Sequence, residues 1–384
     1  MKRSYFLLIL SFFSYLLSYA QPGPSFFNLN DGIGDIIIID STTNLARIAL
    51  LKQQRNLHLI VMLPTFPVEF KDFVHTESLT IEAPTNCNTL DIYFPNLKHL
   101  NIRRFQKKTI ADKKFAFPTL QSLYIMDSKN LEDIDAFANC INIEKIMIRN
   151  TPNLIQFPKF HRKNKVKELI LDHGTTFRKN DTKNYLKPIK RLTKLKKLTL
   201  GNIYSVNEVP SYLPSSIEYL EINSWALHNH ITRIKSLQHL KKYTNLKTLK
   251  LYKIALDPVQ EKFPAVSLEY LFLTMVQGVK DISWIFTFKG IDHVELRNCN
   301  ELTEIYADTN TDVISTLDIR AAANLTSIDA LFRLNNLKYV YVRNCPNLVL
   351  PSTEIMYKTP NIMLSGTKYH LYKKDGVWEK IVYY

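Results

Sequence analysis

Cysteine and glycine are scarce in this chain of 384 residues, which contains 4 Cys and 9 Gly. It has no glycine-rich phosphate loop, nucleophile elbow, Cys-x-x-Cys pair or His-Glu-x-x-His motif, which removes the usual signatures of nucleotide binding, hydrolysis and zinc catalysis. His228 and His230 form a His-x-His pair without acidic or cysteine partners nearby, and two ligands are too few for a metal site. We therefore predict no enzyme activity, no cofactor and no metal.

Long apolar runs are also few, and the one at the N-terminus stretches from Tyr5 to Leu17. It follows Met-Lys-Arg and precedes Ser18-Tyr19-Ala20, an order typical of a secretory signal. We predict a signal peptide over 1–20, cleaved after Ala20, with no transmembrane segment in the mature chain. An uncleaved anchor is the alternative, although the run is short for a membrane span. Export would place the protein in the periplasm, at the cell surface or outside the cell.

A repeat dominates the rest of the sequence. Eleven copies of Leu-x-x-Leu-x-Leu, with Ile or Val at some positions, begin at residues 97, 120, 143, 166, 195, 217, 246, 268, 291, 314 and 337. A weaker twelfth copy begins at Thr76. A period in the twenties predicts stacked units, each too small to bury its own apolar face alone.

These copies, with their second halves such as LQSLYIMDSKNLEDI and LKYVYVRNCPNLVL, resemble the leucine-rich repeat family and in particular the internalin-like repeats of secreted bacterial proteins. The resemblance covers roughly residues 76–351. It implies a horseshoe in which each unit gives one strand to a concave parallel sheet, and it implies that this sheet binds a protein or another ligand.

Side-chain alternation agrees with that fold, because the fourth and sixth residues of each copy share one face of a strand and enter the core. Apolar residues at every third position, as in Ile328, Leu331 and Leu334, favour a 3-10 turn or short helix on the convex side. Phe157-Pro158 favours an extended return instead. We predict an α/β repeat solenoid with about 12 repeats and a mixed convex side.

The two ends predict caps that cover the exposed core of the solenoid. Residues 21–75 contain two apolar runs, 34–40 and 57–61, which we interpret as buried strands that begin the sheet. Residues 352–384 predict a C-terminal β-hairpin around Asp375-Gly376. The hairpin either only caps the last repeat or also binds a ligand.

The repeat register also predicts the state of the four cysteines. Cys87 and Cys140 take inward columns, and Cys299 and Cys345 share the ninth column two strands apart. Two strand spacings are about 9–10 Å, whereas a disulfide needs Cα atoms within about 7 Å. We interpret all four as buried free thiols that fill the core.

Positions three, five and seven of each copy predict the concave surface. On it we select an aromatic cluster with its neighbouring charges and an arginine ladder as the ligand-binding candidates: Tyr219, Glu221, Lys250, Tyr252, Tyr270, Phe272, Glu295, Arg297, Arg320, Tyr341 and Arg343. Exposed aromatic residues flanked by charge are typical of interface hot spots. The alternatives are ordinary packing for the rings, and pairing of the arginines with Glu295 and Asp318 across strands.

The net charge is +15, or +13 once Lys2 and Arg3 leave with the signal. Residues 178–197 hold nine Lys or Arg and one Asp, within the first of two 29-residue repeats. This segment is either a solvated insertion or a contact for an anionic glycan or other polyanion, through Lys187, Lys190, Arg191, Lys194 and Lys197. The second long repeat, from Ile217, predicts a local bulge.

We therefore predict a secreted or envelope, non-catalytic monomer that binds a protein through its concave sheet. Binding of an anionic glycan or other polyanion through the basic segment is the alternative. We expect no nucleic-acid partner for an exported protein.

Overall fold

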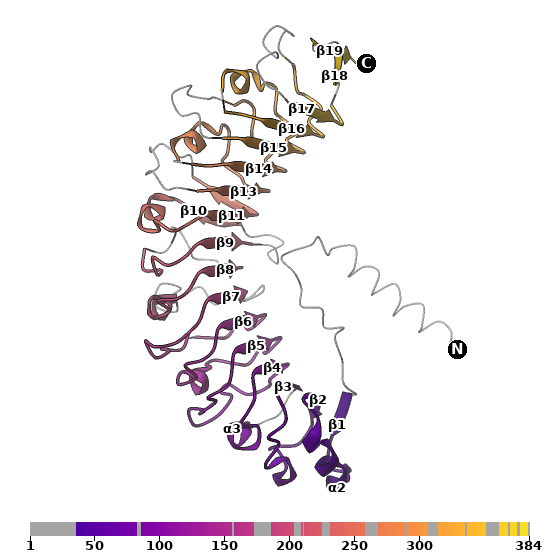
Figure 1. Cartoon of the computed structure of the whole chain (residues 1–384), viewed down its shortest axis with the longest axis vertical. Helices are drawn as coiled ribbons and strands as arrows, with labels where there is room; N and C mark the ends of the chain where they lie inside the picture. Colours follow the sequence, from indigo (N-terminus) through magenta and orange to yellow (C-terminus); the bar gives the residue numbers. More distant parts are fainter. Residues whose placement is uncertain are drawn as a thin grey trace, which may run out of the picture.

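The computed structural model shows one curved stack of repeats (Figure 1). It describes residues 36–82, 86–155, 157–172, 186–202, 209, 211–224, 231–257, 268–288, 290–305, 314–334, 336–350, 361–367, 369–374 and 377–382. Strands follow the inner side of the arc, and short helical turns follow the outer side. The fold is a leucine-rich repeat solenoid, as predicted.

Every repeat gives one five-residue strand to the sheet, and several give a helical turn to the return segment. The first half contains β1 (Ile36–Ile39), α2 (Leu45–Ala49), η1 (Leu50–Gln53), β2 (Asn56–Val61), η2 (Val68–Phe70), β3 (Ser78–Glu82), α3 (Leu90–Tyr93), β4 (His99–Arg103), β5 (Ser122–Met126), η3 (Asp135–Phe137), β6 (Lys145–Arg149), β7 (Glu168–Asp172), η5 (Lys187–Arg191) and β8 (Lys197–Gly201). The second half contains β9 (Tyr219–Asn223), β10 (Thr232–Ile234), η6 (Gln238–Lys242), β11 (Thr248–Tyr252), β12 (Ile254–Leu256), β13 (Tyr270–Thr274), η7 (Ser283–Thr287), β14 (His293–Arg297), β15 (Thr316–Arg320), η8 (Asp329–Arg333), β16 (Tyr339–Arg343), β17 (Asn361–Ser365), β18 (Tyr369–Lys374) and β19 (Val377–Val382).

Fifteen of these strands form one sheet in the order β1 to β9, β11, then β13 to β17. Neighbours are parallel, and each residue pairs with the residue at the same repeat position on the next strand. Leu220 of β9, for example, lies opposite Leu198 of β8 and Leu249 of β11. The repeat register therefore sets the sheet register, and every column named from the sequence is a physical row on the sheet.

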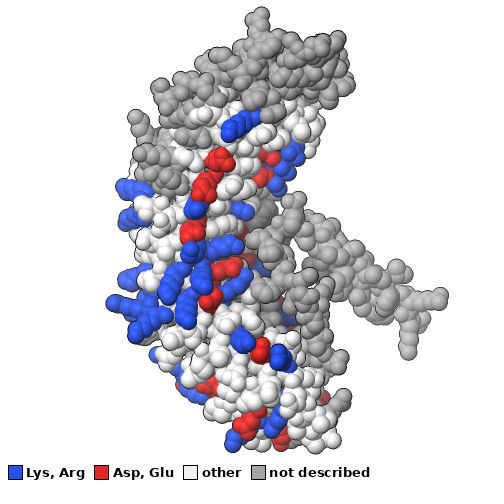
Figure 2. Space-filling model, viewed as in Figure 1, with Lys and Arg blue, Asp and Glu red and all other residues white. Residues whose placement is uncertain are grey.

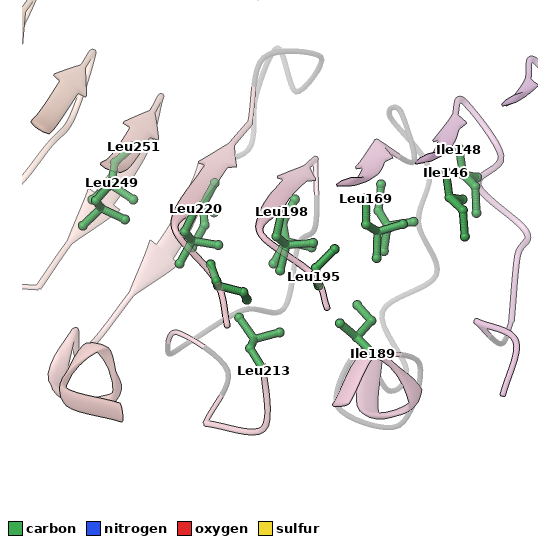
Figure 3. Packing of buried hydrophobic residues seen from close by; sticks show 14 of the residues in the cluster. Ile146, Ile148, Leu169, Ile189, Leu195, Leu198, Leu213, Leu220, Leu249 and Leu251 are labelled. Atoms are coloured by element: carbon green, nitrogen blue, oxygen red, sulfur yellow. The ribbon is translucent and has the colours of Figure 1, made fainter. Parts of the chain in front are cut away.

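The core lies between the sheet and the return segments. Leu198 and Leu220 point from their strands toward Leu195 and Leu213 (Figure 3), and all four side chains are buried. On the outer side, Ile189 of η5 points inward and belongs to the same buried cluster. Since each layer closes only against its neighbours, the core is continuous along the whole arc.

A left-handed backbone corner ends most concave strands. The positive φ angles belong to Arg104, Asp127, Asn150, Asn202, Lys253, Met275, Asn298, Ala321 and Asn344, and to Gly366 after β17. At each of the nine non-glycine corners the N–H donates to a carbonyl of the next strand, as from Ala321 to Arg343 at 2.8 Å. The corner turns the chain from the sheet into the return segment at the same point of every repeat.

The N-terminal strands differ from the expectation of full burial. β1 and β2 do begin the sheet, but Ile36 and Ile38 are each 56% exposed while Ile39 is buried. Ile36 and Ile38 fall in the fifth and seventh columns of the repeat, which face the concave side. A run of four isoleucines offers no polar alternation from which this could be read.

The C-terminal segment contains a strand that the sequence did not predict. β17 continues the sheet beyond the last recognised repeat, with Ile362 and Leu364 buried in the fourth and sixth columns. β18 and β19 pair antiparallel in the segment where we expected a hairpin. The second long repeat contributes β10 to a small parallel sheet with β12, at the place of the predicted bulge.

Some predictions fall on residues that the structure does not describe, and others can be compared with it. The signal peptide, its cleavage point and the His228–His230 pair lie outside them. All four cysteines are buried, as expected from their columns, and carry free thiols. Within the described residues, no helix has the length and apolar character that a membrane crossing needs.

Candidate ligand-binding face

Lys250 lies at the centre of the predicted aromatic cluster. Its ammonium nitrogen is 4.5 Å from the centre of the Phe272 ring and 5.5 Å from that of the Tyr219 ring. The three residues come from β13, β11 and β9, which are adjacent in the sheet. Burial lowers the pKa of Lys250, although the charges of Glu221 and Glu295 act in the opposite direction. The structure therefore brings these residues together as cation–π contacts on a half-buried surface.

Glu221 is hydrogen-bonded within the cluster. It accepts hydrogen bonds from the Tyr219 hydroxyl at 2.6 Å and from the Asn223 side-chain amide at 2.9 Å. Only 9% of Glu221 is exposed, so it is less accessible than its place in the predicted ligand set implies. Burial, with the charge of Glu221, raises the pKa of Tyr219. This network fixes the position of the Tyr219 ring.

Tyr270 and Phe272 form an exposed platform with His293, which the sequence analysis did not select. The centres of the Tyr270 and Phe272 rings are 6.4 Å apart with 17° between their planes. His293 of β14 lies 6.0 Å from Tyr270 and 5.9 Å from Phe272. Tyr270 is 40% exposed. His293 occupies the third column beside Tyr270, so the repeat register alone was sufficient to include it.

Tyr252 sits apart from the platform. It lies in the seventh column of β11, opposite Asn223 and Thr274. Burial is the main cause that raises its pKa to about 12, and the charges of Glu221 and Glu295 add to it. Tyr252 therefore borders the cluster on its seventh-column side.

The arginine ladder occupies successive strands in the seventh column, Arg297, Arg320 and Arg343. Arg297 pairs with Glu295 on its own strand, and Arg320 binds Asp318 on its own strand through three hydrogen bonds of 2.5 to 3.1 Å. Cross-strand pairing, the arrangement weighed from the sequence, occurs between Arg343 and Asp318 at 3.6 Å. Glu295 is 7% exposed and acts as a support for Arg297.

Tyr339 and Tyr341 lie beside the end of the ladder on β16. Their rings are nearly parallel, at 5°, with centres 6.3 Å apart. The Arg343 guanidinium lies 5.5 Å from the centre of the Tyr341 ring. Tyr339 is 42% exposed, so this pair forms a second aromatic platform three strands from Tyr270.

Residues 178–185 of the basic segment lie outside the described ranges, and the described part, 186–197, divides between two surfaces. Lys187, Lys190 and Arg191 belong to η5 on the return side, and Lys194 follows it. Lys197 is instead in the third column of β8, 5.3 Å from the Tyr219 ring and 3.9 Å from a Glu168 oxygen. It therefore belongs to the concave face and not with the other four.

Three further basic residues lie next to η5. Arg162, Lys163 and Lys165 are exposed on the preceding return segment, which the Asn164 amide joins to the carbonyl of Arg191 at 3.1 Å. We call these three residues, with Lys187, Lys190, Arg191 and Lys194, the basic flank. None of the seven forms an ion pair within the part of the chain that the structure describes.

The second column of the repeat behaves differently. Four of its lysines pair with glutamates of neighbouring repeats: Lys98 with Glu77, Lys167 with Glu144, Lys196 with Glu218, and Lys247 with Glu269, at 2.8 to 3.2 Å. Figure 2 shows the alternating acidic and basic side chains along the molecule and the basic cluster at mid-height, where η5 lies. Charge is thus balanced along the second column and unbalanced at the basic flank.

The similarities of the chain to known proteins are distant. No family model matches it. The disease resistance protein RPS6 of Arabidopsis thaliana is 21% identical over 279 residues, which make up 68% of this chain and 22% of that protein. The chain thus corresponds to less than a quarter of the length of this curated relative.

The solved structures with some similarity to the chain include three from two bacteria. They are the internalin InlF of Listeria monocytogenes (15% identity, 86% of this chain and 80% of that chain, TM-score 0.40), internalin C2 of the same species (20%, 58% and 81%, 0.30) and the Leptospira interrogans protein LIC12759 (14%, 86% and 100%, 0.38).

Within the described residues, no three His, Cys, Asp or Glu side chains form a group able to hold a metal ion.

Proposed function

We propose that this leucine-rich repeat solenoid binds a protein partner through its concave face, between β9 and β16, and performs no catalysis. One observation carries the proposal: two exposed aromatic platforms, at Tyr270 and Tyr339, stand on a continuous sheet. Aromatic rings and arginines on a fixed surface are the groups that dominate binding energy at protein interfaces.

Preorganisation supports the same proposal. Tyr219, Lys250 and Phe272 are held by cation–π contacts, and Glu221 fixes the Tyr219 hydroxyl. A partner would therefore order few side chains when it binds, which reduces the entropy cost of association. From β9 to β16 the face extends over roughly 24 Å at the usual strand spacing, a length suited to a folded domain or an extended segment.

Affinity capture from envelope and host-surface extracts tests the proposal. The double variant Tyr270→Ala/Phe272→Ala should lose a protein that the unaltered chain captures at both low and high salt. A matched control, Ile155→Ala/Val349→Ala, removes two exposed apolar side chains from the return segments and should retain it. Equal capture by all three proteins would refute the concave site.

The same proposal includes export, on the basis of the N-terminal sequence. The mature protein would be secreted or face the cell envelope of a bacterium. N-terminal sequencing of the protein from a producing cell should begin at Gln21. A chain that begins at Met1 would contradict cleavage after Ala20.

Polyanion binding is the second candidate, favoured by the seven basic-flank residues, none of which pairs with an acidic residue in the described part of the chain. Unpaired surface cations attract anionic polymers, and added salt screens the attraction. Replacing Lys187, Lys190, Arg191 and Lys194 by Gln should shift elution from a sulfated-polysaccharide column to lower salt. The matched control replaces the paired lysines Lys98, Lys167, Lys196 and Lys247 by Gln, and an equal shift in that variant would show only an effect of net charge.

A further inference from the structure

We propose that Arg343, with Tyr339 and Tyr341, forms a subsite for an aspartate or glutamate side chain of the protein partner. This inference rests on the proposed function and specifies the chemistry that the concave face recognises. Three observations among the described residues support it: few carboxylates lie around Arg343, one nitrogen of its guanidinium has no hydrogen-bond partner, and two aromatic rings lie beside it.

The shortage follows from how the ladder is paired. Arg297 uses Glu295, and Arg320 engages both oxygens of Asp318, with its closest contact at 2.5 Å. Arg343 approaches Asp318 no closer than 3.6 Å, which is too long for a hydrogen bond. Three guanidiniums therefore share two carboxylates, and the surplus positive charge falls at Arg343.

One hydrogen-bond donor of Arg343 is also unused. Its Nε atom is buried and has no hydrogen-bond partner among the described residues. A buried donor without a partner costs free energy, so the environment inside the described fold does not fully satisfy this guanidinium. The side chain is nevertheless 35% exposed, so an incoming group can reach the guanidinium from the concave side.

The surroundings of Arg343 suit a carboxylate carried on a short side chain. A guanidinium presents its donors in a planar fork that matches the two oxygens of a carboxylate. The Tyr341 ring lies 5.5 Å from the guanidinium, and the nearly parallel Tyr339 ring is 42% exposed. The rings offer apolar contact to the backbone or neighbouring side chain of an acidic segment, while the arginine binds its charge.

The first test observes Arg343 directly. In protein carrying ¹⁵N in its arginine side chains, the Nε–H signal of Arg343 is assigned by its loss in Arg343→Gln. Titration with 4-hydroxyphenylacetate should shift that signal saturably, and the uncharged 4-hydroxyphenylacetamide should not. The signal of Arg320, already bonded to Asp318, should stay in place. An Arg343 signal that ignores both compounds, or moves equally with both, overturns the subsite.

The second test uses a labelled peptide of alternating Glu and Tyr, with Gln replacing Glu in the control peptide. Arg343→Gln should weaken binding of the acidic peptide about tenfold, the effect expected for one charge-assisted hydrogen-bond pair. The variant with Lys187, Lys190, Arg191 and Lys194 replaced by Gln should bind within about twofold of the unaltered chain, because surface charges that do not contact the ligand contribute little. Loss in that variant alone would place the acidic site on the basic flank.

The two proposals fail separately. If Tyr270→Ala/Phe272→Ala abolishes capture of the partner and Arg343→Gln leaves it intact, the concave face stands and the carboxylate subsite is wrong. If neither variant affects capture, both are wrong. Thermal melts of each variant, followed by circular dichroism, confirm that the folded state is being compared.

Discussion

Two adjacent alanines after β15 should respond to glycine substitution with opposite signs. Ala321 has a left-handed φ of 52°. Ala322 does not have a positive φ, and its side chain is fully buried. An L-residue in the left-handed region costs about 1–2 kcal/mol, and glycine removes that cost. Glycine also raises the conformational entropy of the unfolded chain, which lowers the free energy of unfolding by about 0.4–1 kcal/mol. Ala321→Gly should therefore stabilise the protein by about 0.5–1 kcal/mol.

Ala322→Gly has no such compensation. It removes a buried methyl group, worth about 0.8 kcal/mol, and adds the same unfolded-state cost. The expected destabilisation is about 1–2 kcal/mol, so the two variants should differ by about 2 kcal/mol. The backbone bond from Ala321 N–H to the Arg343 carbonyl, 2.8 Å long, survives in both variants.

Urea unfolding followed by circular dichroism measures this pair of effects. The unfolding midpoint should rise for Ala321→Gly and fall for Ala322→Gly, at an unchanged slope. Two variants that are destabilised alike would refute the left-handed corner at this position. Since the same corner recurs along the sheet, that result would also undermine the regular turn from each strand into its return segment.

Three further predictions follow from the core and the concave face. Leu271→Ala, in a fully buried position, should cost about 2–5 kcal/mol in urea unfolding, and Phe272→Ala clearly less; equal losses would contradict the assigned faces of β13. Burial raises the pKa of Cys87 and Cys140 to about 12, so a thiol reagent at neutral pH should label them only after denaturation, and labelling of the folded chain would contradict their burial. The pKa values of these two thiols are higher in the folded protein than in the unfolded chain. Their contribution to the free energy of unfolding is therefore fully present below the ordinary thiol pKa and is lost as pH rises toward about 12. Glu221→Gln should lower the raised pKa of Tyr219 in an ultraviolet titration, since it removes the charge and the charged acceptor; an unchanged titration would contradict that contact.

The strand faces could be predicted from the sequence because two rules act together. The repeat spacing gives the register, and side-chain alternation gives the face, so Leu220 is inside and Tyr219 outside without further information. The same reasoning correctly made Tyr219, Lys250 and Phe272 neighbours. It missed β17, although Ile362 and Leu364 fall in the fourth and sixth columns and Thr359 falls in the first, as Thr76 does in the weak copy that was recognised.

Other features of the concave face depend on contacts between neighbouring side chains, which the position of a residue in the repeat does not determine. Glu295 and Glu221 lie in outward columns, yet their neighbours cover them almost fully, because side chains on a concave surface crowd together. The choice of Arg320 over Arg343 as the main partner of Asp318 is a matter of side-chain conformation. Asparagine, which tolerates positive φ, occupies four of the nine non-glycine corners, but Arg, Lys, Met and Ala occupy others, so residue type alone does not mark the corner.

Radical footprinting of the protein with its captured partner tests the concave site most directly. Exposed aromatic rings are oxidised in the free protein, and a bound partner shields the rings that it covers. We predict that Tyr270, Phe272 and Tyr339 lose oxidation in the complex, while Ile155 and Val349 on the return segments keep theirs. Shielding of Ile155 and Val349, with Tyr270 and Phe272 still oxidised, would contradict binding through the concave face.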